Sequence, residues 1–112
     1  MGEVSERVGT SVLFENDRVR VWEDGAGPGE TKPLHVHRRP YITVVIAGEE
    51  ADNLGEDGSL LRRFEGLTPG QAHYVGPNDL PIVHALRNTG STEVSVLIIE
   101  LLTQPDQEQQ RM

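Results

Sequence analysis

Glycine and proline interrupt this chain so often that its apolar runs are too short for ordinary helices. The 112-residue sequence holds 12 glycines and 7 prolines, and both residue types weaken the interior of a helix or strand. The runs between them are rich in Val, Ile, Leu and aromatic residues, and their lengths favour strands. We predict strands at residues 11–15, 18–23, 41–47, 71–75, 82–87 and 93–102, with at most one turn of helix near Val4 and Val8.

Turn signals separate these runs at the intervals expected of an antiparallel protein. Asn16-Asp17 predicts a hairpin turn, residues 25–29 predict a Gly/Pro loop, and residues 56–59 and 88–91 predict tight turns. Seven or eight short strands therefore predict an all-β sandwich or barrel, since a sheet must bury one face and closure removes its exposed edges. The length predicts a single β-barrel domain over residues 1–103, and residues 104–112 read as a polar, disordered tail.

Charge and composition exclude several classes of function. The chain carries 10 Lys+Arg against 18 Asp+Glu, a formal net charge of -8, which argues against nucleic acid and anionic membranes as partners. The absence of cysteine excludes disulfides, thiolate metal sites and thiol nucleophiles. No apolar run has the length of a membrane span, and the N-terminal residues lack the apolar core of a signal peptide. We therefore expect a cytoplasmic protein.

His35 and His37 are the first candidates for chemistry. They stand two residues apart, so on a strand their side chains point to the same face, with Cα atoms about 6.6 Å apart. Two neutral imidazoles at that spacing can converge on one metal ion. An isolated His-x-His is also compatible with two histidines on a strand surface.

The residues around this pair resemble the cupin family. The first cupin motif, Gly-x5-His-x-His-x3/4-Glu-x6-Gly, is matched at Gly29, His35, His37 and Gly48, and the second at Gly70, His84 and Asn88. The resemblance covers about residues 18–102 and implies a small RmlC-like double-stranded β-helix, a jelly-roll barrel. It also implies one divalent transition metal (Fe, Zn, Ni or Cu) held by His35, His37 and His84.

The chain departs from the family pattern where the first motif has its glutamate, because Tyr41 stands there. If the strand from His35 is unbroken, Tyr41 points into the barrel, although Pro40 could bulge the strand. A neutral tyrosine is a weak ligand; it either fills the barrel or bonds a metal-bound water or a substrate, as a catalytic residue. The segment 78–83 is longer than the usual loop, which we expect to reshape the barrel mouth.

Three further features leave their roles open. His73 alternates with Gln71 and Val75; it either lines the cavity as a proton carrier, a second catalytic candidate, or lies at the surface or a dimer contact. Glu100 is an alternative acidic ligand, although we interpret it as the exposed phase of its strand. Arg18 and Arg20 share a face with Trp22 and either hold an anionic substrate or pair with nearby acids.

The strand at 41–47 is apolar on both faces, because Ile42, Val44 and Ile46 form its other side. Such a strand must be covered twice, and in a small chain the second cover can be another subunit. Cupins are commonly dimers, so the pattern and the resemblance together predict an isologous homodimer.

The resemblance implies three classes of function, all with a small molecule as partner. The first is a metal-dependent enzyme with a three-histidine centre like that of cupin dioxygenases. The second is a cyclase, isomerase or lyase, similar to cupin-type polyketide cyclases, in which the metal acts as a Lewis acid and Tyr41 or His73 carries a proton. The third is a non-catalytic module that binds a small ligand, since one fold serves many functions.

Overall fold

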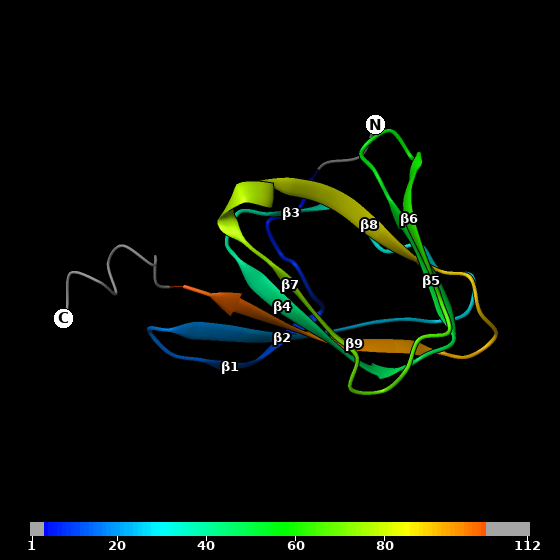
Figure 1. Cartoon of the computed structure of the whole chain (residues 1–112), viewed down its shortest axis with the longest axis horizontal. Helices are drawn as coiled ribbons and strands as arrows, with labels where there is room; N and C mark the ends of the chain where they lie inside the picture. Colours follow the sequence, from blue (N-terminus) through cyan, green and yellow to red (C-terminus); the bar gives the residue numbers. More distant parts are fainter. Residues whose placement is uncertain (1–3, 103–112) are drawn as a thin grey trace.

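The computed structural model describes residues 4–102, which form two antiparallel β-sheets facing each other (Figure 1). The first sheet has the strand order β1 (Ser11–Glu15), β2 (Val19–Ala26), β9 (Val94–Leu101), β4 (Tyr41–Ala47) and β7 (Ala72–Val75). The second has the order β3 (His35–His37), β8 (Ile82–Asn88), β5 (Glu50–Leu54) and β6 (Leu60–Glu65), and a short 3-10 turn, η1 (Pro77–Asp79), precedes β8. Within this described range no helix has the length and hydropathy needed to cross a membrane.

The predicted all-β class is confirmed, and the predicted strands at 11–15 and 41–47 have the observed bounds of β1 and β4. The loop predicted at 25–29 is partly wrong, because β2 continues through Gly25 and Ala26, which pair with Ser95 and Val94 of β9. The described residues hold nine strands rather than seven or eight, since β3, β5 and β6 were not among the predicted runs. The tail predicted at 104–112 lies outside the described residues.

The core lies between the two sheets, on the inner face of the five-stranded sheet. Trp22, Tyr41 and Ile98 come from three of its strands, and the N-terminal segment adds Val8, which is 2% exposed. This segment is held against the second sheet by a bridge between Ser5 and His35, in which the Val36 N–H donates to the Ser5 carbonyl at 2.9 Å. The segment thus covers the inner face beside β3.

Asn88, a residue of the second cupin motif, ties the β8–β9 turn to the end of β2. Its side chain is fully buried, and its Nδ2 donates to the carbonyls of Ala26 and Thr92 at 2.9 and 2.8 Å. Its Oδ1 accepts from the Gly90 N–H at 2.8 Å. Every polar atom of a buried amide needs such a partner, so the role of Asn88 is structural.

The outer face of the five-stranded sheet carries a continuous apolar row. Cross-strand neighbours from all five strands compose it, namely Phe14, Val21, Ile99, Ile42 and Tyr74. The two ends of the row are open to solvent, with Phe14 54% and Tyr74 62% exposed. Cross-strand neighbours share one face of a sheet, so these side chains form a single surface.

Candidate metal centre

The two cupin motifs bring three histidines together between the sheets. His35 and His84 are direct partners in the antiparallel pairing of β3 with β8, and His37 follows on the same face of β3. One ring nitrogen from each of the three lies within 4.8 Å of those of the other two. His35 is 6% and His37 2% exposed, so these two potential ligands are shielded from bulk water.

The spacing of the imidazoles fits a single ion. The Nε2 atoms of His35 and His37 are 3.1 Å apart. Two nitrogens that each bind one metal at about 2.1 Å lie about 3.0–3.4 Å apart at octahedral or tetrahedral angles. The three rings meet nearly at right angles, with centroids 4.7 to 4.9 Å apart. The His35, His37 and His84 group could therefore hold a metal.

The second ring nitrogens differ in their surroundings. His35 Nδ1 lies 3.3 Å from the Pro33 carbonyl, which favours the tautomer that leaves Nε2 free as a ligand. His37 Nδ1 is buried and has no hydrogen-bond partner within residues 4–102. If Nε2 of His37 bound a metal, Nδ1 would carry the ring proton, and the described residues give that N–H no acceptor.

Burial keeps all three histidines neutral. Loss of solvent, together with the neighbouring His35 and His84, lowers the pKa of His37 to about 2. Burial and His35 together lower the pKa of His84 to about 4. Burial also lowers the pKa of His35. Neutral imidazole is the form that binds metal, so the group is ready to bind without losing protons at pH 7.

Tyr41 lies beside this group, although not by the route that the sequence suggested. The strand is broken, because β3 belongs to the four-stranded sheet and β4 to the five-stranded one. Tyr41 nevertheless faces inward, is 3% exposed and stacks on His37 with ring centroids 3.9 Å apart and 16° between the planes. Burial raises the pKa of its phenol to about 12, so the hydroxyl stays protonated at pH 7.

The interpretation of Glu100 as an exposed residue is wrong. Glu100 is 6% exposed and is the cross-strand partner of Tyr41 on the inner face. Its Oε1 accepts a hydrogen bond from the indole N–H of Trp22 at 2.6 Å. The carboxylate is buried because this indole needs an acceptor between the sheets. Glu100 is outside the group of potential metal ligands found among the described residues.

The guanidinium of Arg20 forms ion pairs with neighbouring acidic side chains. Its guanidinium pairs with Glu15 at 2.8 Å and approaches Glu100 at 3.5 Å. Of the two readings that the sequence allowed for this residue, pairing with neighbouring acids is the one observed.

His73 lies on the inner face but apart from the three histidines. It is the cross-strand partner of Thr43 and is half-buried, and its ring centroid lies 5.9 Å from that of Phe64 on β6. The group of potential ligands does not include it. Its predicted role as a proton carrier stays a prediction.

The long segment 78–83 shapes an open pocket of about 320 Å³ at one end of the barrel. Pro77, Leu80 and Pro81 form one wall, and Arg38 and Pro40 from the β3–β4 connection form the other. Leu80 also packs against the core cluster that contains Tyr41. The segment therefore borders this pocket, and its effect on the mouth of the barrel stays a prediction.

Solved structures share this architecture. A cupin domain from Bordetella pertussis Tohama I matches 90% of this chain and 98% of its own length at 24% identity and a TM-score of 0.68. A conserved protein with a double-stranded β-helix domain from Klebsiella pneumoniae matches 81% of this chain and 69% of its own at 25% identity and a TM-score of 0.60. The lyase DddQ from Ruegeria pomeroyi, which acts on DMSP, matches 77% of this chain and 39% of its own at 24% identity and a TM-score of 0.55.

No family model and no curated protein matches the chain. The strand order and these likenesses show that it has the double-stranded β-helix fold of the cupin superfamily, as the two motifs predicted.

Proposed function

We propose that this cupin binds one divalent transition metal through His35, His37 and His84 and acts there on a small molecule. The observation that carries the proposal is the convergence of three neutral imidazoles, two of them buried and 3.1 Å apart at Nε2 and the third, His84, half-buried. Fe, Zn, Ni and Cu all accept imidazole, so this donor set does not select among them. When bound, such an ion would supply Lewis acidity and open positions for a substrate.

One candidate reaction is oxygen-dependent, like that of the cupin dioxygenases. Its support is the composition of the site: the family's carboxylate position holds Tyr41, and Glu100 is engaged by Trp22. The ligands are then three neutral histidines, the set that the resemblance associates with these dioxygenases.

The second candidate is a cyclase, isomerase or lyase reaction, which needs no oxygen. Its support is the phenol of Tyr41, held against His37 and protonated up to a pKa of about 12. A fixed hydroxyl beside the centre can donate a hydrogen bond to a developing enolate or take part in proton transfer. The likeness to a lyase in fold points in the same direction.

Oxygen dependence separates these reactions. Protein loaded with iron(II), zinc or nickel is incubated with a panel of dicarbonyls, thiols and hydroxy-ketones in air and under argon. An oxygen-dependent enzyme consumes oxygen and is silent under argon, whereas a Lewis-acid enzyme turns over in both. A protein with no turnover in either condition that gains thermal stability from a panel member is a binding module, which would overturn the catalytic part of the proposal.

We also propose that a second copy of the chain covers the apolar row of the five-stranded sheet. The row crosses all five strands, and its exposed ends, Phe14 and Tyr74, are aromatic. An exposed apolar surface of this kind is typical of an interface, and a two-fold pairing of the same face on both copies closes it.

A further inference from the structure

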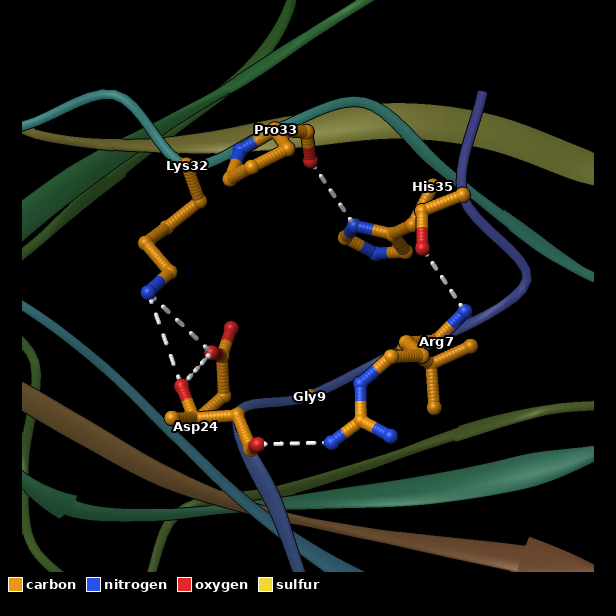
Figure 2. Close-up of a pocket in the computed structure, with 9 residues that line it drawn as sticks. Arg7, Gly9, Asp24, Lys32, Pro33 and His35 are labelled. Carbon is orange, nitrogen blue, oxygen red and sulfur yellow. Dashed lines mark hydrogen bonds and ion pairs between the residues drawn. The ribbon is translucent and has the colours of Figure 1, made fainter. Parts of the chain in front are cut away.

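A second cavity adjoins the metal centre at His35 (Figure 2). It has a volume of about 220 Å³ and lies between the N-terminal segment, β2 and the residues that lead into β3. His35 is the one histidine of the centre among its lining residues, which are Ser5, Arg7, Val8, Gly9, Thr10, Asp24, Lys32, Pro33 and His35. A volume of this size suits a ligand of a few heavy atoms.

Asp24 offers this cavity a hydrogen-bond acceptor that nothing in the described chain uses. The residue is 5% exposed, and its Oδ1 accepts from Thr10 Oγ1 at 2.9 Å and pairs with Lys32 Nζ at 3.8 Å. Among residues 4–102 no donor reaches Oδ2, and Figure 2 shows this oxygen directed into the cavity. Oδ2 is not among the fully buried side-chain atoms of the described residues that lack a partner, so solvent reaches it from the cavity, and a bound hydroxyl can replace that water as its donor.

The other charges of the cavity are positive. Lys32 is largely buried, with 19% of its side chain exposed. Arg7 lies over the Trp22 ring at 5.1 Å and uses its Nη2 to donate to the Thr10 carbonyl at 2.8 Å, which leaves further N–H donors of the guanidinium. With His35 neutral, two cations and one anion give the cavity a local charge of +1, opposite in sign to the chain as a whole. The cavity therefore favours a ligand that carries one negative charge.

We propose that this cavity binds a small hydroxycarboxylate. The hydroxyl donates to Oδ2 of Asp24, and the carboxylate accepts from Arg7 and Lys32. An amino acid fits less well, because its ammonium would sit beside Lys32, which already neutralises the same carboxylate. The site does not depend on a metal at the three histidines, so this inference is independent of the proposed function.

The test compares three ligands on the full chain after removal of metal. L-Lactate carries both groups, propionate lacks the hydroxyl, and 1,2-propanediol lacks the carboxylate. We expect saturable binding of lactate by calorimetry or NMR titration, with propionate and the diol each weaker by about tenfold or more, since each loses a charge-assisted hydrogen bond. Equal affinity for lactate and propionate, or no saturation with lactate, would overturn the proposal.

Variants locate the binding. Arg7→Gln and Asp24→Asn should each lower the affinity for lactate by about tenfold. Arg62→Gln on β6 is the matched control and should leave this affinity unchanged. Circular dichroism shows whether Asp24→Asn folds; if it does not, Arg7→Gln on the exposed N-terminal segment still decides. His84→Ala should keep lactate binding, because His84 does not line the cavity. Loss of binding in His84→Ala, or full affinity in Arg7→Gln, would place the ligand elsewhere.

Discussion

The phenol ring of Tyr41 lies flat on the imidazole of His37, with centroids 3.9 Å apart and 16° between the planes. This contact joins the two sheets, since the tyrosine belongs to β4 and the histidine to β3. Tyr41 also stands at the sequence position where the cupin motif has a glutamate. The residue that departs from the cupin motif therefore covers one face of a candidate ligand.

Replacing Tyr41 by glutamate should add the carboxylate that the cupin motif has at this position. We expect Tyr41→Glu to tighten zinc or nickel binding by about tenfold or more, measured by competition with a chromogenic chelator, because a carboxylate is a far better ligand than a neutral phenol. Tyr41→Phe is the matched control: it keeps the stacked ring, and metal affinity should not change. Unchanged affinity in Tyr41→Glu would mean that this side chain does not reach the ion.

Glu100 should matter for stability and not for metal. Glu100→Ala leaves the Trp22 indole N–H buried without its acceptor at 2.6 Å, so the free energy of unfolding should fall by about 1.5–3 kcal/mol. Urea titration measures the loss, and Trp22→Phe in the same background should cause little further loss from this bond. Metal content should stay at the wild-type level; a Glu100→Ala protein that is folded and metal-free would show that the carboxylate is a ligand after all.

The metal-free protein should lose stability between pH 7 and pH 5. The native pKa values of His37 and His84, about 2 and about 4, lie below the ordinary value of 6.5, so the unfolded chain binds protons that the native one does not. Stability is therefore complete above pH 6.5 and falls with pH, by about 1.4 kcal/mol per histidine at pH 5.5.

Urea unfolding at pH 7.5 and 5.5 checks this pH dependence. His84→Gln removes one titrating group, so the difference between the two pH values should shrink. Acids whose pKa is lowered, such as Asp52 beside Arg63, titrate below this window and do not confuse the result. Equal stability of the metal-free wild type at both pH values would refute the burial of neutral histidines.

The apolar row predicts the oligomeric state. Light scattering after size exclusion should give twice the mass of the chain for the wild type, and Phe14→Glu should give the mass of one chain because it places a charge in the row. Leu61→Glu is the control, since Leu61 is similarly exposed at 57% but lies on β6 of the other sheet. A monomeric wild type, or dissociation by the control alone, contradicts a dimer through this face.

The strands that the sequence predicted are those with strong punctuation and apolar composition. Pro40 and Gly48 bracket β4, and a short turn follows β1. The β5–β6 hairpin was missed because charged residues face each other across it, such as Asp52 and Arg63 at 2.9 Å. This ion pair satisfies a buried acid. The turn signal at residues 56–59 marked the connection, but the polar composition on either side of it did not mark the two segments as strands.

The sequence likewise indicated some residues between the sheets and missed others. The resemblance to the cupin motifs implied that His35, His37 and His84 meet, and the pairing of β3 with β8 brings these three histidines onto two neighbouring strands. Asp24 and Glu100 were not recognised as buried, since their partners come from other strands and from the N-terminal segment. The available signal was parity: each shares its strand face with a large apolar residue two positions away.

Elemental analysis of the untagged protein, purified without chelators, tests the central claim most directly. The account predicts about one equivalent of a transition metal per chain, and almost none in His35→Ala and His84→Ala proteins that circular dichroism shows to be folded. Iron would favour the oxygen-dependent reaction, and zinc or nickel the Lewis-acid one. Full metal content in both variants would contradict the three-histidine centre, as would a wild type that neither carries nor takes up iron, nickel or zinc.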